Sequence, residues 1–290
     1  MRSGFVAIVG RPNVGKSTLI NAMVGSKVSI TSIRPQTTRN TIRGVVHRPG
    51  AQLVLVDTPG LHKPKTALGH RLNDLIRGTL ADADVVVVVL DATAEMGPGD
   101  RLVSERARDS LSPVIMALNK IDKASRGAIA RHLTEGARWD FAAYVPVSAL
   151  TGESVTPLLD EVENLLPEGP PYFPPEMITD QPEEVLVAEI VREKFLARLR
   201  EELPHSLAAL VTEREERADG SLFFRVDLKV ERQSQKGIVI GEGGKMIAAA
   251  GAEARKELES IFGVKVFLDL KVGVEADWQQ HDGLLDRLGF

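Results

Sequence analysis

The chain reads Gly10-Arg11-Pro12-Asn13-Val14-Gly15-Lys16-Ser17 directly after the apolar run Phe5–Val9, and residues 18–24 that follow have helical character. A glycine, four variable residues and Gly-Lys-Ser between a strand and a helix form the pattern of a phosphate-binding loop. The backbone N–H groups of such a loop point inward at the positive end of a helix dipole, where they bind anions. A chance glycine-lysine turn is the alternative, but it does not account for the strand, the spacing and the helix together.

Residues of this loop have distinct chemical uses. Gly10 and Gly15 let the backbone turn tightly. Lys16 would place a positive charge between the β- and γ-phosphates, and the Ser17 hydroxyl would ligate Mg²⁺. We therefore predict nucleotide contacts from Gly10, Arg11, Pro12, Asn13, Val14, Gly15, Lys16, Ser17 and Thr18.

Length and composition limit the class of protein. A chain of 290 residues suits two domains. The net charge of -4 gives no overall signal for nucleic acid, so such binding would need a local basic patch. The sequence has no cysteine, which excludes disulfides and thiolate metal sites and is compatible with a reducing cytosol. We see no signal peptide, and the longest apolar run, Val85–Leu90, is far too short to span a membrane. We expect a soluble, cytoplasmic protein.

Short β-branched runs alternate with helical stretches from Phe5 to about Leu166. We predict strands at Phe5–Val9, Leu53–Val56, Val85–Leu90, Val114–Leu118 and Tyr144–Val147, and helices near 70–80, 99–109, 125–136 and 155–166. The strand runs lack polar alternation, as in a parallel sheet that is buried on both faces. The more polar run Thr41–His47 should pair antiparallel at an edge. The first half is therefore predicted to be a doubly wound, mostly parallel α/β domain.

Two segments are expected to contact the γ-phosphate. Asp57-Thr58-Pro59-Gly60 follows a predicted strand, where Asp57 could hold Mg²⁺ through water and the Gly60 N–H could donate to a phosphate oxygen. Asp-Thr-Pro-Gly is also ordinary turn chemistry, but its position after a phosphate-binding loop favours the functional interpretation.

The polar segment 32–39 lies between these two motifs. We expect Thr38, with Thr37 as the alternative, to bring a hydroxyl to Mg²⁺ when the γ-phosphate is present; a solvated loop without a ligand is the other interpretation. Segment 61–65 would be a second nucleotide-sensitive segment. The predicted metal ligands are Ser17, Thr38 and Asp57, and the predicted catalytic residues are Lys16, Thr38 and Gly60.

A third motif selects the base. Asn119-Lys120-Ile121-Asp122 follows the strand Val114–Leu118. The Asp122 carboxylate can accept hydrogen bonds from N1–H and the N2 amino group of guanine; adenine lacks both donors and would leave the carboxylate unpaired. Asn119 would hold neighbouring loops, and the stem of Lys120 can cover the ring. Ser148-Ala149-Leu150 would add a backbone N–H to guanine O6. The predicted ligands are therefore GTP and GDP.

Residues 167–182 are too rich in proline for a helix or strand and indicate a semi-rigid linker, which divides residues 1–166 from residues 183–290. The second part is predicted to contain an amphipathic helix at Glu183–Arg200, strands at Leu207–Val211 and Leu222–Val230, and a last strand at Val264–Leu270. Between them lies a Gly-x-x-Gly loop flanked by two helical segments. This order of elements matches a smaller α+β domain of the type II KH class.

The loop Gly241-Glu242-Gly243-Gly244 would bring backbone amides close to about four nucleotides of single-stranded RNA. A glycine-rich helix start without ligand is the alternative, and the carboxylate of Glu242 would repel phosphate. This half of the chain also carries more acidic than basic residues. Nearby cations can still dominate, because charges are screened over about 8 Å at physiological salt. The predicted RNA contacts are Lys229, Arg232, Lys236, Gly241, Glu242, Gly243, Gly244 and Lys245.

The first half resembles a translation-factor-class GTPase, with five guanine-nucleotide motifs in order. It departs from the Ras-like pattern at Leu61, where those enzymes place a glutamine that orients the attacking water. The resemblance therefore implies slow unaided hydrolysis. In related GTPases an asparagine equivalent to Asn13 helps to bind K⁺, so K⁺ is a further candidate cofactor beside Mg²⁺; Asn13 as a plain turn residue is the alternative.

Over essentially its whole length the chain resembles the Era family of bacterial GTPases. The matching segments are residues 36–39, Glu201–Ser206, Ile240–Ile247 and Trp278–Phe290. The resemblance implies a monomeric GTPase switch that binds near the 3′ end of 16S ribosomal RNA, acts in 30S subunit assembly and associates peripherally with the membrane. A P-loop kinase and a GTPase whose second domain binds protein or membrane are the alternatives; the guanine motifs argue against the first, and salt-sensitive RNA binding would exclude the second.

Overall fold

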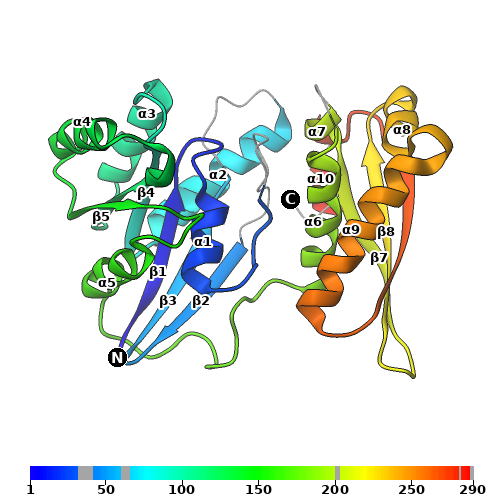
Figure 1. The fold of residues 1–290 in the computed structure, drawn as a ribbon, viewed down its shortest axis with the longest axis horizontal. Coiled ribbons are helices and arrows are strands. Elements are labelled where there is room, and N and C mark those ends of the chain that lie inside the picture. The colour runs from blue at the N-terminus through cyan, green and yellow to red at the C-terminus, as the bar shows by residue number, and fades with distance from the viewer. Residues whose placement is uncertain (32–41, 60–65, 200–202, 281, 288–290) are drawn as a thin grey trace. The chain divides into compact units, whose positions relative to one another are not determined.

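The computed structural model describes residues 1–31, 42–59, 66–199, 203–280 and 282–287 (Figure 1). The chain divides into two compact units: the first ends at Asp180, and the second consists mainly of the residues from Gln181 onward, together with Thr66–Leu68. The boundary therefore lies near the carboxyl end of the predicted linker. Thr37, Thr38, Gly60 and Leu61 lie outside the described residues.

The first unit contains a six-stranded sheet in the order β2-β3-β1-β4-β5-β6. The strands are β1 (Arg2–Val9), β2 (Ile42–Arg48), β3 (Ala51–Asp57), β4 (Val85–Asp91), β5 (Val114–Asn119) and β6 (Ala143–Val147). Only β2 among them is antiparallel to its neighbour β3, and the other pairs are parallel. The predicted mostly parallel sheet with an antiparallel edge strand is confirmed.

Helices cover both faces of this sheet. They are α1 (Lys16–Val24), α2 (Ala67–Asp82), α3 (Pro98–Arg108), α4 (Arg126–Gly136) and α5 (Val155–Leu165), with short 3₁₀ turns η1 (Ile121–Lys123) and η2 (Ala137–Trp139). Side chains of α1 and α5 pack on one face, and those of α2, α3 and α4 on the other. The doubly wound α/β class is therefore confirmed.

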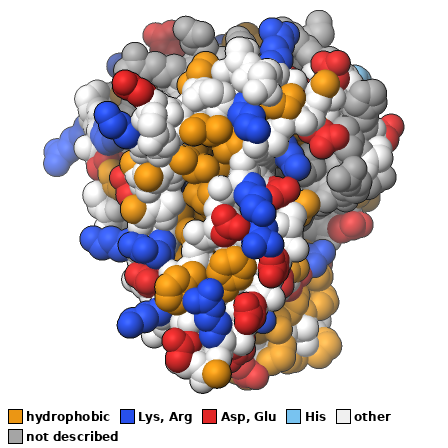
Figure 2. Space-filling view, turned by 90° about the vertical axis from the view of Figure 1, so that its right-hand side faces the viewer, with side chains coloured by type: hydrophobic (Ala, Val, Ile, Leu, Met, Phe, Trp, Pro, Cys, Tyr) orange, Lys and Arg blue, Asp and Glu red, His pale blue; other side chains and the backbone are white. Residues whose placement is uncertain are grey.

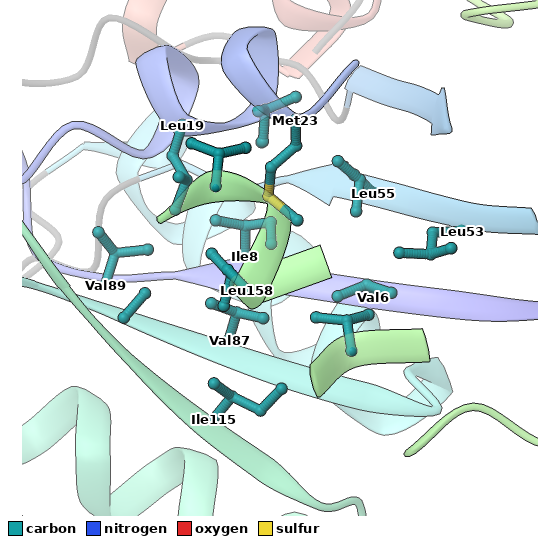
Figure 3. Close-up of a cluster of buried hydrophobic side chains, with 14 of the residues drawn as sticks. Val6, Ile8, Leu19, Met23, Leu53, Leu55, Val87, Val89, Ile115 and Leu158 are labelled. Carbon is teal, nitrogen blue, oxygen red and sulfur yellow. The ribbon is translucent and has the colours of Figure 1, made fainter. Parts of the chain in front are cut away.

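Strand β1 shows why the strand sequences lack polar alternation. Val6 and Ile8 point into the core beneath α1 and α5 (Figure 3), while Ala7 and Val9 point into the opposite core. All four side chains are buried. A strand that is covered on both faces needs apolar residues at every position, so its sequence is continuously hydrophobic.

The linker runs along the first unit rather than away from it. The amide side chain of Gln52, in β3, accepts hydrogen bonds from the backbone N–H of Tyr172 (2.6 Å) and Phe173 (3.0 Å) and donates to the carbonyl of Phe173 (2.7 Å). Gln52 is fully buried, and the ring of Tyr172 packs on that of Phe5 with centroids 4.7 Å apart. One side chain thus satisfies three backbone groups of a segment that forms no helix or strand.

The linker continues along the edge strand β2. The backbone N–H of Val45 donates to the carbonyl of Ile178 (2.8 Å), and the Thr179 hydroxyl donates to the carbonyl of Arg43 (2.7 Å). The Arg43 guanidinium also pairs with Asp180. These contacts occupy backbone groups that an exposed sheet edge would otherwise offer to another chain.

We predict that Gln52→Ala destabilises the first unit by about 1–3 kcal/mol, because two donors and one acceptor lose their buried partner. Hydrogen exchange at Tyr172 and Phe173 should accelerate in the same variant. Gln233→Ala, at an exposed position, is the matched control. Unchanged exchange at these two amides would show that Gln52 does not fix the linker.

The second unit contains a three-stranded sheet in the order β7-β8-β9, with β7 antiparallel and β9 parallel to β8. Its elements are α6 (Glu183–Leu196), α7 (Leu203–Ser206), β7 (Ala208–Glu216), β8 (Leu222–Val230), α8 (Gln233–Ile240), η3 (Glu242–Gly244), α9 (Lys245–Phe262), β9 (Val266–Val274), η4 (Trp278–Gln280) and α10 (Asp282–Arg287). The order of helix, two strands, helix, glycine loop, helix and strand is that of the predicted type II KH domain.

Strand β8 alternates as predicted, with every second residue from Leu222 to Val230 buried. The prediction of an amphipathic helix at 183–200 is wrong, because α6 is buried on most of its sides. Three of its charged residues, Glu189, Arg192 and Glu193, are buried too, and Arg192 forms an ion pair with Glu189 (2.6 Å) one turn away. Charged residues can be buried in a helix when they are paired. The sequence of α6 therefore has the mixture of apolar and charged residues that is typical of a half-exposed helix.

Candidate functional site

The phosphate-binding loop connects β1 to α1, as predicted. Gly15 has a φ of 98°, in the left-handed region, and a Cβ there would lie 2.4 Å from the side-chain nitrogen of Asn119. Both the conformation and the space therefore require glycine. The loop ends at Lys16, the first residue of α1, so its backbone N–H groups lie at the amino end of a helix.

Lys16 is held inside this loop. Its Nζ donates to the backbone carbonyls of Gly10 (3.1 Å) and Arg11 (3.2 Å). Burial lowers the pKa of Lys16 to about 8, and the nearby Asp57 carboxylate opposes that shift. An anionic phosphate near the ammonium group would favour the charged form of Lys16. A bound nucleotide would therefore offset the free-energy cost of burying this charge.

The predicted metal ligands Ser17 and Asp57 come together. The Ser17 hydroxyl donates to Asp57 Oδ2 at 2.8 Å, although the two residues come from α1 and the end of β3. One hydroxyl and one carboxylate are oxygen donors of the kind that Mg²⁺ prefers, and Mg²⁺ takes few protein ligands beside phosphate and water. The residues present therefore fit the predicted ion, which would neutralise phosphate charge.

A second hydroxyl at this point was missed by the sequence reasoning. Ser29 is fully buried and donates to the same Asp57 Oδ2 at 2.7 Å. Asn21 fixes the segment around it: its carbonyl oxygen accepts from the N–H groups of Val28 and Ser29, and its amide donates to the Ser29 carbonyl (2.7 Å). Ser29 is therefore a second residue, outside α1, that orients the carboxylate.

We predict that Ser29→Ala raises the Mg²⁺ concentration required for half-maximal GTP hydrolysis by about 10-fold, the lower end of the usual effect of losing a residue that orients a metal ligand. Titration of Mg²⁺ against the hydrolysis rate measures this effect. Ser26→Ala, at an exposed position in the same segment, is the control. An unchanged Mg²⁺ requirement would contradict the orienting role.

The base-recognition residues converge from two loops. Asn119, at the end of β5, donates to the backbone carbonyl of Val14 (2.8 Å) and accepts from the N–H of Ala149 (2.9 Å). The Ser148 hydroxyl donates to Asp122 Oδ1 at 2.7 Å, which holds that carboxylate in place. The phosphate loop and the two predicted guanine loops thus form one hydrogen-bonded unit.

Lys120 adds a second tie to the phosphate loop. Its Nζ donates to the backbone carbonyl of Asn13 (2.7 Å) and pairs with Asp91 (2.6 Å) at the end of β4. Burial opposes ionisation of Asp91, but hydrogen bonds from Lys120 and Thr93 together lower its pKa. Asp91 was not predicted, yet it follows the strand Val85–Leu90 at the sheet edge where function is expected.

Arg11 ties the same loop to α3. Its Nε donates to Asp100 Oδ1 at 2.9 Å, and Asp100 is buried in the first turn of that helix. Asp100 also accepts from the backbone N–H of Gly97 (3.0 Å). No local pattern in the sequence joins residues so far apart.

The glycine loop of the second unit lies between α8 and α9, as predicted. Gly241 has a φ of 75°, and a Cβ there would lie 2.5 Å from the Cβ of Met246. Gly243 and Gly244 also have positive φ values, of 58° and 77°. The loop therefore exposes backbone without side chains, except at Glu242, whose side chain is exposed.

The predicted cations near this loop differ in their pairing. Lys229 lies 3.2 Å from Asp227, so its charge is partly neutralised. Arg232, Lys236 and Lys245 form no ion pair with any other residue in the described ranges. These three side chains remain available for phosphate.

The fold and these sites define a P-loop GTPase joined to a KH domain. Residues 5–120 match the family described as 50S ribosome-binding GTPase, and residues 202–279 match the KH domain family. GTPase Era of Mycobacterium avium (strain 104) is 50% identical over 295 residues, covering 100% of this chain and 99% of that protein. GTPase Era of Nocardioides sp. is 50% identical over 301 residues, covering 100% and 96%.

Two solved structures are similar over the full length. A single-residue variant of Aquifex aeolicus Era bound to GDP·AlF4⁻ has a TM-score of 0.96 at 38% identity, covering 100% of this chain and 99% of that chain. Era in complex with MgGDPNP and nucleotides 1506–1542 of 16S ribosomal RNA has a TM-score of 0.95 at 38% identity, with the same coverage. The chain belongs to the Era family of GTPases. It hydrolyses GTP, with Mg²⁺ as its metal cofactor.

Proposed function

We propose that this GTPase is a switch that binds the 3′ end of 16S ribosomal RNA through its KH domain and acts in assembly of the 30S subunit. The glycine loop Gly241–Gly244 carries this proposal: it has three positive-φ glycines, and Lys245, which forms no ion pair with any described residue, follows it directly. The similar Era structure with bound 16S ribosomal RNA nucleotides supports the same partner. The protein would work in the cytoplasm as a monomer and associate peripherally with the membrane. Among the described residues, no helix is both long and apolar enough to cross a bilayer.

The nucleotide site supports a division of roles. Lys16 and the loop amides would hold the phosphates, Ser17 and Asp57 would hold Mg²⁺, and Asp122 would select guanine. The roles of Thr38 and Gly60 at the γ-phosphate remain predictions. Because Leu61 stands where a water-orienting glutamine is found in Ras-like enzymes, we propose slow intrinsic hydrolysis.

The linker supports a route from nucleotide to RNA. Strand β2 directly follows the segment that contains Thr38, and the same strand pairs with residues 178–180, which lead into the KH domain. A change at the γ-phosphate that moved Thr38 would reach the linker through β2. Hydrolysis would reverse that change.

We predict that the full chain binds a single-stranded oligonucleotide from the 3′ end of 16S ribosomal RNA, and that the logarithm of the affinity falls linearly with the logarithm of salt concentration. Glu242→Lys should tighten binding, because it replaces a repelling carboxylate in the loop. Glu95→Lys, at a surface position in the first unit, controls for net charge. Absence of binding at low salt would contradict an RNA role and favour docking to protein or membrane.

We further propose that K⁺ bound by Asn13 supplies positive charge during hydrolysis. Asn13 is exposed in the phosphate loop, has a φ of 67°, and has its backbone carbonyl held by Lys120. Hydrolysis should run about 10-fold faster in KCl than in NaCl at equal ionic strength, and Asn13→Ala should remove the difference. Equal rates in both salts would leave Asn13 as a turn residue.

A further inference from the structure

The first unit carries a group of cations on and beside α4 that the nucleotide site does not use. Lys123 in η1, Arg126 and Arg131 in α4, and Arg138 in η2 are all exposed. We call these four residues the basic stripe. Residues 123–139 contain these four basic residues and one acidic residue, Glu135, which gives the segment a net charge of +3, whereas the whole chain has -4.

The stripe lies on the outer face of α4, on the side of the sheet that α3 also covers (Figure 1). Arg131 and Arg138 are seven residues apart, or two helical turns, so they follow one another along this face at a spacing of about 10 Å. The Arg131 guanidinium extends towards Gly127, where a Cβ would lie 3.8 Å from its Nη1. On the inner face, Ile129 and Leu133 pack against the buried core.

Helix α4 is fixed to the sheet by contacts of its inner face. His132 is buried, and its Nε2 lies within hydrogen-bond distance of the backbone carbonyls of Ala94 (2.8 Å) and Asp91 (3.2 Å). Gly136 lets the helix approach β5 closely, because a Cβ there would lie 2.6 Å from the Met116 sulfur. The arginines are therefore presented by a rigid element, whose backbone need not be ordered when a partner binds.

The charges of the stripe are not neutralised by neighbouring side chains. None of its four cations forms an ion pair with another residue in the described ranges. Glu135 pairs instead with Arg101 of α3, at 3.3 Å. Cations elsewhere are more closely paired: Arg225 in β8 contacts both Glu213 and Asp269. Figure 2 shows a face of the protein on which Lys and Arg side chains lie among Asp and Glu side chains.

The side chains between the cations indicate which anionic partner fits. A helix that binds a membrane surface carries large apolar residues beside its cations. Within α4, all of which is described, the other exposed positions are Gly127, Ala130 and Thr134. Single-stranded RNA is held by exposed aromatic rings, but Trp139 is partly buried and stacks on Phe141 with centroids 5.7 Å apart. An RNA helix offers regularly spaced phosphates and needs neither feature.

We propose that the basic stripe binds the phosphate backbone of a double-stranded RNA segment. Arg131 and Arg138 contact separate phosphates, and Lys123 and Arg126 extend the contact along the helix. Such binding is largely independent of sequence, because phosphates are the same in every RNA. The inference rests on the proposed function in taking RNA as the partner. It adds a second contact, in the GTPase unit, to a different form of RNA.

The test measures binding of the full chain to two RNAs: a blunt duplex of about 16 base pairs and the single-stranded oligonucleotide from the 3′ end of 16S ribosomal RNA. Arg131→Ala and Arg138→Ala should each weaken duplex binding by roughly 5- to 10-fold at about 0.1 M salt and lower the salt slope by about 1. Arg131→Lys should keep most of the affinity, since neutralising a phosphate needs the charge. Binding of the single strand should not change, because its predicted contacts lie in the KH domain.

Arg77→Ala is the matched control, because Arg77 is an exposed arginine of α2 that pairs with Asp74. The stripe is refuted if the wild-type protein does not bind the duplex at low salt, if both stripe variants bind it as the wild-type protein does, or if Arg77→Ala weakens binding equally. Unchanged thermal unfolding of the stripe variants separates loss of contact from loss of fold.

The two RNAs separate this inference from the proposed function. Single-strand binding without duplex binding would refute the stripe and leave the KH domain as the RNA-binding part. Duplex binding that depends on the stripe, without single-strand binding, would do the reverse. Vesicles of phosphatidylserine and phosphatidylcholine are the third probe. If the stripe variants lose vesicle binding but keep duplex binding, the stripe docks to a membrane surface and the RNA inference is wrong.

Discussion

The side chain of Asn119 is the contact on which the nucleotide site depends. It hydrogen-bonds to Val14 of the phosphate loop and to Ala149 of the guanine loop. Its amide nitrogen lies so close to position 15 that only glycine fits there. Three strand ends are thereby fixed relative to one another before any ligand binds. Such preorganisation matters in phosphoryl transfer, because positioning and charge stabilisation supply most of the catalysis.

A second constraint is the way in which the linker is held. Gln52 and the edge strand β2 supply partners to backbone groups of residues 172–179, so a proline-rich segment becomes part of the GTPase unit. Proline in that segment restricts its conformations further. Fewer linker residues are therefore without hydrogen-bond partners in the GTPase unit than the proline content suggests. Strand β2 connects the predicted Mg²⁺-binding segment to the part of the chain that leads into the KH domain.

Local patterns predicted much of this structure, because the motifs and strand sequences are short and their geometry is local. The phosphate loop, the Asn119–Asp122 motif and the alternating strand β8 follow from a few adjacent residues each. Ser29 and Asp100 could not be found in this way, since their roles arise from contacts with distant residues. The sequence of α6 was misinterpreted because its buried charges are paired. The pairing of Gln52 with the linker depends on two segments that only the tertiary fold brings together.

The central claim is that nucleotide state controls RNA binding, and one measurement tests it directly. The affinity of the full chain for a 16S ribosomal RNA 3′-end oligonucleotide would be determined with GDP and with a non-hydrolysable GTP analogue, at the same salt and Mg²⁺ concentrations. The account predicts affinity about 5- to 150-fold tighter with the GTP analogue, the usual range of coupling between two sites. Equal affinity in both states would contradict the switch and leave an RNA-binding GTPase whose two activities are independent.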